Sequence, residues 1–200
     1  MDKEKIEKIT KFLSEIQMLK RVKHKEVRLA GVENPDSIAE HSALSAQIAY
    51  VLAKFEEADA EKCVVMNLFH DNEEARLGDH HKVSARYLDV KEAERQAEKE
   101  HYSNLSEPIG EELFGLQEEK RERNTKEGII AQDADWLEMA VQAKIYSELG
   151  YQGCELWIDN VEKALETESA KEILAEIRRN PDFLNCWWKG LEKMTYKKLK

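Results

Sequence analysis

Residues 63–71 read Cys63-Val64-Val65-Met66-Asn67-Leu68-Phe69-His70-Asp71, a mostly apolar stretch closed by an imidazole and a carboxylate. Neighbouring side chains on a helix diverge by about 100°. His70 and Asp71 can therefore approach one cation from two directions while the apolar residues before them anchor the turn in the core. Further ligands have to come from other helices, and His41 upstream and Asp135 downstream are the candidates. The pattern predicts a metal-dependent hydrolase.

The composition predicts an all-α protein. Only three prolines and eight glycines occur in 200 residues, and the charged residues, 36% of the chain, are spread between apolar positions. This pattern is typical of amphipathic helices, and the length suits one domain over residues 1–200 with a core of its own. We expect helices near residues 2–22, 37–55, 59–71, 91–104, 109–118, 123–149, 154–166, 170–179 and 182–198.

The segment 37–55 shows how the helices are predicted. Apolar residues recur there at steps of three and four and predict one buried stripe. Asp36 or Ser37 can cap the start of this helix. His41 lies in its first turns beside the stripe, which suits a ligand at the centre of a helix bundle. The members of the stripe are Leu44, Ile48, Val51, Leu52 and Phe55.

Two segments are dense in mixed charges. Residues 91–101 and 117–123 carry acids and bases at spacings that pair along a helix, and we expect both to be solvated faces. His101 is expected at the surface for the same reason. These segments then contribute neither to the core nor to a site.

Charge and cysteines limit the partners. A net charge of −10 opposes binding of long DNA or RNA, which depends on Lys and Arg neutralising phosphates. No apolar stretch is long enough to cross a membrane, and the charged start is unlike a signal sequence. Three cysteines far apart, without C-x-x-C spacing, argue against a disulfide framework and a zinc knuckle. We expect a cytoplasmic protein, and the net charge leaves a small phosphorylated metabolite open as its partner.

The pair His-Asp is weak evidence alone, but its surroundings add specificity. The pieces that carry this specificity are, in chain order, Leu19-Lys20-Arg21-Val22, Asn34-Pro35-Asp36-Ser37-Ile38-Ala39-Glu40-His41-Ser42, His70-Asp71-x-x-Glu74-x-x-x-Gly78-Asp79 and Asp135-x-x-Glu138-Met139. Together they resemble the HD-domain metal-dependent phosphohydrolases, and within them the 5′-deoxynucleotidase branch. The resemblance implies a single all-α HD-domain helical bundle, a homodimer, and hydrolysis of (deoxy)nucleoside 5′-monophosphates to nucleoside and phosphate.

The resemblance also implies one divalent cation held by His41, His70, Asp71 and Asp135. Imidazole nitrogens with carboxylate oxygens suit Mn²⁺, Co²⁺, Ni²⁺, Fe²⁺ or Zn²⁺ and are less characteristic of Mg²⁺, so the identity of the cation stays open. Water on that cation would be the nucleophile. Asp133 points about 200° away from Asp135 on a helix, so only one of them can bind, and the family pattern favours Asp135.

Two acids are expected to act in catalysis. Glu74 follows His70 by four residues and would orient or deprotonate the attacking water. Asp79 follows a glycine, which permits a tight turn, and would hold the ribose or pass a proton to the leaving oxygen. The neighbouring residues 80–82 (His-His-Lys) could reach a phosphate but are more often idle in such loops.

The substrate side departs from the family pattern. The family usually has an arginine and a tryptophan where this chain has His24 and Val27. We expect Arg21, His24 or Arg28 to supply the charge that binds the phosphate. Because these substrate-binding positions differ, two alternatives stay open. The chain is then a phosphohydrolase for another small phosphorylated metabolite, or a metal- or nucleotide-binding regulator without turnover.

Overall fold

The computed structural model describes residues 2–191, and within them the chain is helical and forms no strand. A single isolated bridge joins Lys23 to Ser37. The all-α prediction is therefore confirmed. The helices are α1 (Lys3–Glu15), α2 (Ile38–Phe55), α3 (Ala60–Phe69), α4 (Glu74–Leu77), α5 (Lys82–Ala85), α6 (Val90–Tyr102), α7 (Glu107–Glu122), α8 (Lys126–Glu148), α9 (Glu155–Ala164) and α10 (Glu168–Arg179), with short 3₁₀ turns at Ile16–Lys20, Val27–Ala30, Gln152–Cys154 and Phe183–Asn185.

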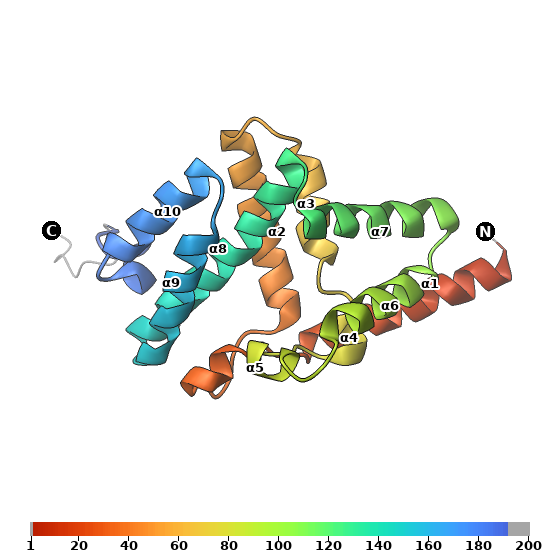
Figure 1. Cartoon of the computed structure of the whole chain (residues 1–200), viewed down its shortest axis with the longest axis horizontal. Helices are drawn as coiled ribbons and strands as arrows, with labels where there is room; N and C mark the ends of the chain where they lie inside the picture. Colours follow the sequence, from red (N-terminus) through yellow and green to blue (C-terminus); the bar gives the residue numbers. More distant parts are fainter. Residues whose placement is uncertain (1, 192–200) are drawn as a thin grey trace, which may run out of the picture.

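Helix α8 lies at the centre of the bundle (Figure 1). It packs against α2 and α3 on one side and against α9 and α10 on the other. Its buried residues Ile130, Leu137 and Ala140 join Leu52 of α2 and Leu174 of α10 in the main core. Because α2, α3 and α8 meet there, side chains from all three can reach one point.

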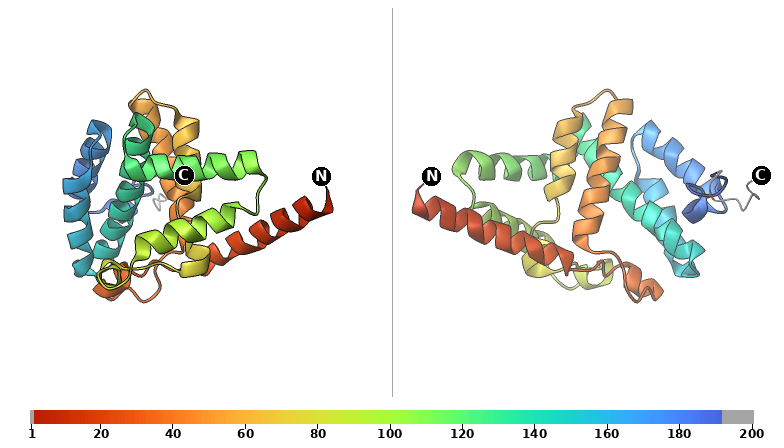
Figure 2. Two further views of the ribbon diagram at one scale, coloured as in Figure 1. Left: turned by 45° about the vertical axis from the view of Figure 1, so that its right-hand side comes forward. Right: turned by 180° about the vertical axis from the view of Figure 1, so that it is seen from behind.

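Helices α1, α6 and α7 project together to one side of this bundle (Figure 2). A smaller cluster of Phe12, Tyr102 and Leu113 holds the three helices together, and Phe69 at the end of α3 packs against it. The hydroxyl of Tyr102 donates a hydrogen bond of 3.0 Å to the carbonyl of Phe69. This contact ties the projecting helices to the residues directly before His70.

The start of α2 is capped as the sequence predicts. The Ser37 side chain accepts from the Glu40 N–H, and the Glu40 carboxylate accepts from the N–H of Ser37 at 2.6 Å. This reciprocal pair is a capping box, which satisfies two donors at the helix end. It sets the first turn of α2 and with it the position of His41.

The predicted stripe of α2 is only partly buried. Leu52 is fully buried, but Leu44, Val51 and Phe55 are 47%, 46% and 71% exposed. The reason is that α2 is clamped between α3 and α8, and the faces that meet are built from small residues that allow close approach. These are Ser42, Ser45, Ala46, Ala49 and Ala53.

The expectation that the charged segments are solvated is also wrong in part. Glu98 and His101 of α6 are fully buried, and Gln117 and Lys120 of α7 are nearly so. Each has tertiary neighbours that a single-helix pattern does not include, such as Phe12, whose ring lies 4.7 Å from that of His101.

Helix boundaries differ at several places. The expected helix 2–22 ends at Glu15 and continues as a 3₁₀ turn, and α7 runs on until Arg123, whose φ of 48° ends it. The short helices α4 and α5 were not predicted. Of the expected helix 182–198, the described part holds the turn Phe183–Asn185, and residues 192–200 lie outside the described residues. Within residues 2–191, no helix combines the length and apolarity that crossing a membrane requires.

Candidate active site

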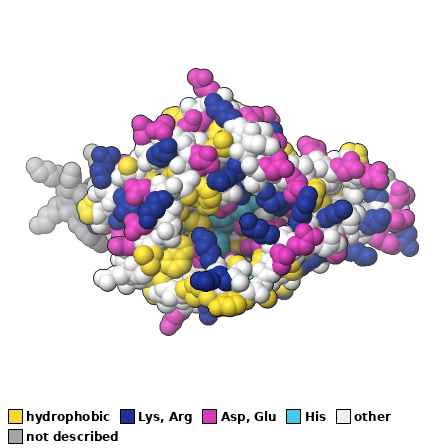
Figure 3. All heavy atoms as spheres, viewed as in Figure 1, with side chains coloured by type: hydrophobic (Ala, Val, Ile, Leu, Met, Phe, Trp, Pro, Cys, Tyr) yellow, Lys and Arg dark blue, Asp and Glu magenta, His cyan; other side chains and the backbone are white. Residues whose placement is uncertain are grey.

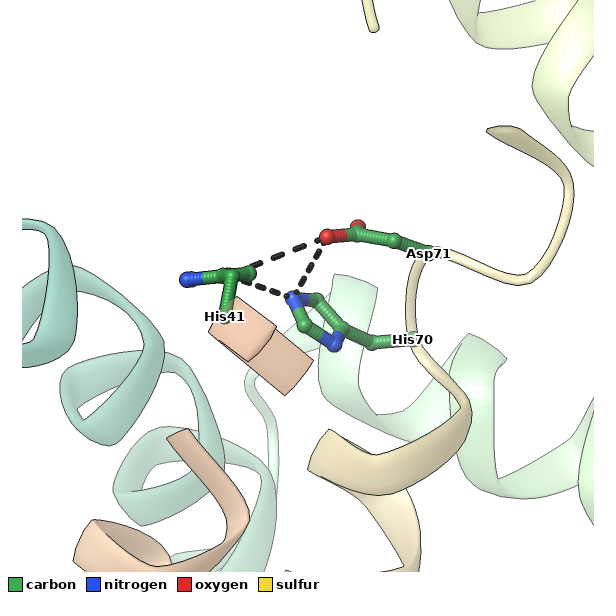
Figure 4. A group of neighbouring side chains, drawn as sticks. All are labelled: His41, His70 and Asp71. Carbon is green, nitrogen blue, oxygen red and sulfur yellow. Dashed lines mark hydrogen bonds and ion pairs between the residues drawn. The ribbon is translucent and has the colours of Figure 1, made fainter. Parts of the chain in front are cut away.

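Two histidines and an aspartate converge where α2 meets the segment after α3. His41 comes from α2, and His70 and Asp71 follow α3, with all three side chains turned toward one another (Figure 4). The two Nε2 atoms are 3.2 Å apart, and Asp71 Oδ2 lies 3.0 Å from His70 Nε2 and 3.7 Å from His41 Nε2. These ligand atoms all lie within 4.8 Å of one another.

Asp135 joins the group from α8. Its Oδ1 lies 3.1 Å from His41 Nε2 and 3.6 Å from His70 Nε2. The four side chains that the sequence singles out as ligands therefore lie together in the fold. They come from α2, the turn after α3, and α8.

Hydrogen bonds on the far side of each imidazole aim its Nε2 at this point. His41 Nδ1 lies 2.5 Å from Glu138 Oε2, and His70 Nδ1 lies 2.7 Å from the carbonyl oxygen of Asn67. A carbonyl only accepts, so Nδ1 of His70 carries the proton and its Nε2 keeps a lone pair. The carboxylate of Glu138 selects the same tautomer in His41.

The arrangement fits a divalent cation. Two imidazole lone pairs that face each other at 3.2 Å repel unless a cation or proton lies between them. Donors bound to one ion at about 2.0–2.2 Å are roughly 3.0–3.4 Å apart when adjacent. Three of the distances among these atoms, 3.0, 3.1 and 3.2 Å, match that spacing, and the other two, 3.6 and 3.7 Å, are slightly longer.

The electrostatics of the group without a cation agree with this fit. Burial lowers the pKa of His41, but Asp135 and Glu138 outweigh it and hold that pKa well above its ordinary value. Burial raises the pKa of Asp71, yet His70 and His41 lower it to about 2. Asp135 is likewise held ionised, with its pKa well below the usual range despite burial. A site this rich in ionised acids attracts positive charge.

Glu74 and Asp79 lie beside the ligands. Glu74 begins α4, and its Oε2 is buried and makes no hydrogen bond in the structure. Burial raises the pKa of Glu74 well above its ordinary value, and the charges of Asp71 and Asp79 raise it further. Gly78 adopts φ of +70°, the turn conformation expected before Asp79, whose carboxylate accepts from the N–H of Lys25.

Asp79 and three of the four ligand residues, His41, Asp71 and Asp135, line a cleft of about 290 Å³. Figure 3 shows histidine side chains in a hollow of this face, with lysine and arginine side chains around it and hydrophobic side chains on one side. One wall of the cleft carries the acids and imidazoles, and the opposite wall comes from α8 and α9. The lining residues of that second wall are Trp136, Met139, Trp157, Asn160, Val161 and Ala164.

The residues predicted to bind substrate divide into two groups. His24 is buried in the cleft wall, with its ring 4.6 Å from that of His41 and its Nδ1 3.1 Å from Asp36 Oδ2. Lys82 also lines the cleft. Arg21 and Arg28 are exposed and are not among the lining residues.

Three further positions have structural roles. Val27, which stands where the family usually has tryptophan, is buried in the main core and not in the cleft. His81 accepts through Nδ1 from the N–H of Ser84 at 3.0 Å and so caps α5. Asp133 is buried and accepts from the N–H groups of Glu166 and Thr167, away from the imidazoles.

Comparisons with known proteins place the chain in a family. A family model described as an HD domain matches residues 16–178. The chain belongs to the HD-domain family. This HD-domain protein is 33% identical to the 5′-deoxynucleotidase HDDC2 of Dictyostelium discoideum over 136 aligned residues. The aligned region covers 61% of this chain and 68% of that protein. The 5′-deoxynucleotidase HDDC2 of Homo sapiens is 29% identical over 147 residues, 72% of this chain and 71% of that protein.

Solved structures give the same result for the fold. A conserved hypothetical protein from Pyrococcus furiosus superposes on the HD-domain protein with a TM-score of 0.73 and 29% identity, covering 86% of this chain and 99% of that chain. The match extends over nearly the whole of the other chain, so the arrangement of helices described above is shared.

Sequence reasoning missed the residues that support the ligands. Glu138 stands in the motif without a predicted role, Asn67 has no predicted role either, and Lys120 was expected on a solvated face. In the HD-domain protein Lys120 Nζ lies 2.8 Å from Asp135 Oδ2. The spacing of Glu138, three residues after Asp135 and on the same face of α8, is a signal that could have found it. No local signal marks Lys120, which comes from another helix.

Proposed function

We propose that this HD-domain protein is a divalent-metal-dependent phosphomonoesterase that hydrolyses deoxynucleoside 5′-monophosphates to nucleoside and phosphate. The observation that carries the proposal is the convergence of His41, His70, Asp71 and Asp135 at one edge of a cleft. The related proteins from Dictyostelium discoideum and Homo sapiens bear the name 5′-deoxynucleotidase, which supports the choice of substrate.

The four ligand residues would hold the cation, with both histidines binding through Nε2. When bound, a divalent cation polarises the phosphoryl group and lowers the pKa of water, and it needs no covalent intermediate with the protein. The remaining steps fall to side chains of the chain itself. His41 and His70 keep their tautomer through Glu138 and the Asn67 carbonyl, so the donor atoms are oriented before substrate arrives.

Glu74 and Asp79 would move the protons. Glu74 has a buried carboxyl oxygen without a partner beside Asp71, and we assign it to take the proton from the attacking water. As the P–O5′ bond breaks, the leaving 5′-oxygen receives a proton, and Asp79 at the cleft wall is placed to deliver it. Glu74 then releases its proton to solvent and Asp79 takes one up from solvent, so both carboxyl groups return to their starting states.

The substrate side of the cleft would use two different surfaces. His24 and Lys82, both of which line the cleft, would bind the phosphate, whereas Arg21 and Arg28 lie outside the lining. The wall with Trp136 and Trp157 suits the flat apolar surface of a nucleobase. The side chains that would bind the substrate thus differ from the arginine and tryptophan of the family pattern.

A panel assay tests this function. Purified protein is stripped of metal, loaded with Mn²⁺, Co²⁺, Ni²⁺, Zn²⁺ or Mg²⁺ in turn, and supplied with each deoxynucleoside and ribonucleoside 5′-monophosphate. Phosphate release from the deoxy substrates that requires a cation is the expected result. Equal rates on an aryl phosphate or a sugar phosphate would favour a different small substrate, and binding without release would favour a regulator.

We also propose that the protein is a homodimer in the cytoplasm. The exposed side chains Leu44, Val51 and Phe55 form a stripe along one face of α2, which is an apolar surface of the kind that subunits bury. All three cysteines are free thiols, in agreement with a reducing compartment. Light scattering should give twice the mass of the chain, and Phe55→Glu should halve it. A monomeric wild-type protein would refute the dimer.

A further inference from the structure

Lys120 is a buried cation at the edge of the proposed metal site. It lies on α7, is 5% exposed, and its Nζ donates to Asp135 Oδ2 at 2.8 Å. The amide of Gln132 donates to the same oxygen at 3.0 Å. Lysine is rarely buried without a paired acid, so this contact fixes the position of the Lys120 side chain as well as that of Asp135.

The two oxygens of Asp135 therefore do different things. Oδ2 receives hydrogen bonds from Lys120 and Gln132, whereas Oδ1 lies 3.1 Å from His41 Nε2 and 3.6 Å from His70 Nε2. A carboxylate oxygen has about two lone-pair directions, and on Oδ2 the ammonium and the amide occupy both. The carboxylate is thus oriented to offer one oxygen to the cation and not two.

Lys120 also changes the charge of the site. The ionised carboxylates of Asp71 and Asp135 lie against the imidazoles, and the Lys120 ammonium offsets the charge of Asp135. Like charges repel more strongly in a buried site than in water. Lys120 therefore opposes binding of the divalent cation while it makes the loaded site more attractive to a phosphate dianion.

We propose that Lys120 is a positioning residue that restricts Asp135 to one ligand oxygen. Its positive charge weakens binding of the cation and makes the site more electropositive once the cation is bound. This inference rests on the proposed ligand set. It extends that set by assigning a role to a residue of α7, which contributes no ligand of its own. A merely structural lysine would affect stability and leave the coordination of the cation unchanged.

The test compares Lys120→Met with wild-type protein loaded with Co²⁺. We expect the variant to bind Co²⁺ about tenfold more tightly in a calorimetric titration and to change the visible absorption of the bound Co²⁺, because Oδ2 is released and a repelling charge is lost. The kcat/KM for a deoxynucleotide should fall by about 10- to 100-fold, the range typical of residues that support metal ligands. Lys120→Arg, which keeps charge and donor, should restore the wild-type absorption.

Lys62→Met is the matched control. Lys62 Nζ pairs with Glu119 Oε1 of α7 at 2.7 Å and not with a ligand residue, so its loss should alter neither Co²⁺ affinity nor absorption. Lys120→Gln serves if the methionine variant does not fold. Weaker Co²⁺ binding in Lys120→Met, or absorption identical to wild type, would overturn the inference. Failure of the wild-type protein to bind Co²⁺ at all would instead refute the ligand set on which it depends.

Discussion

The imidazole of His41 is held through both of its ring nitrogens. Glu138 contacts its Nδ1 at 2.5 Å, and Asp135 and His70 lie within 3.2 Å of its Nε2. Glu138 itself is almost fully buried, so water screens its contact with His41 only weakly. The basicity and direction of the His41 donor atom therefore depend on Glu138.

Replacing Glu138 by Gln should weaken metal binding without removing a ligand. The amide cannot stabilise the His41 tautomer as a carboxylate does, and such supporting changes typically cost about 10- to 100-fold in metal affinity or activity. Calorimetric titration with Mn²⁺ measures the affinity directly. Glu148→Gln is the control, since Glu148 lies on the same helix but accepts from the N–H groups of Phe183 and Leu184. An unchanged affinity in Glu138→Gln would show that the contact has no such role.

At this scale the sequence predicts the ligands better than their partners. His41, His70, Asp71 and Asp135 were identified because each stands in a motif with neighbours along the chain. Lys120 was assigned to a solvated face, since its partner Asp135 lies 15 residues further along the chain on another helix. A contact of that kind depends on how α7 packs against α8, and a local pattern does not contain that information.

The helices themselves follow from the sequence where one face is apolar or one end is capped. Ser37 caps the start of α2, in agreement with the prediction of Asp36 or Ser37, whereas the contact of Glu40 that completes the capping box was not predicted. The buried face of α2 was predicted poorly, because it contains alanines, which are only weakly hydrophobic and do not stand out in a periodic pattern. Ala49 and Ala53 are nonetheless fully buried, since small side chains allow close packing. Helix α6 shows the same limit, since its buried Glu98 depends on Arg121 of α7.

Glu98 gives a prediction about stability and pH. Burial raises the pKa of this carboxyl to about 6 from 4.5, and the pairing with Arg121 compensates only in part. The folded state therefore keeps the proton to higher pH than the unfolded state, so stability falls as pH rises from about 4.5 to 6 and the loss is complete above that range. The loss is at most about 2 kcal/mol, since one pKa unit corresponds to about 1.4 kcal/mol.

Urea unfolding at pH 4.5 and pH 7 measures this effect. The decrease in free energy of unfolding between the two pH values should be smaller in Glu98→Gln than in wild type. Glu92→Gln, at an exposed position of the same helix, should behave as wild type. Equal decreases in the wild-type protein and in Glu98→Gln would show that Glu98 ionises in the folded state as it does in the unfolded chain.

At the scale of the whole molecule, the bundle brings together residues that are far apart in the sequence. His41 and Asp135 are separated by 94 residues and lie 3.1 Å apart across α2 and α8. The all-α class and most long helices were predictable from composition and periodicity, whereas the projection of α1, α6 and α7 was not. That projection depends on the contact of Phe12, Tyr102 and Leu113 between helices.

Because the ligands come from separate elements, a cation should stabilise the entire fold. The unfolded chain does not hold these side chains together, so binding shifts the equilibrium toward the folded state. At a Mn²⁺ concentration of 100 times the dissociation constant the gain is about 2.7 kcal/mol. Thermal unfolding with Mn²⁺ and with excess chelator should differ accordingly. Identical melting temperatures would mean that no cation binds the folded protein at these concentrations.

Metal content combined with activity in Asp71→Ala tests the central claim most directly. Asp71 Oδ2 lies 3.0 Å from His70 Nε2, so removing this carboxylate takes away one of the converging donors. Elemental analysis of wild-type protein should give one divalent cation per chain and cation-dependent release of phosphate from a deoxynucleotide, and the variant should lose both while remaining folded by circular dichroism. A variant with full metal content and full activity would contradict the assigned centre.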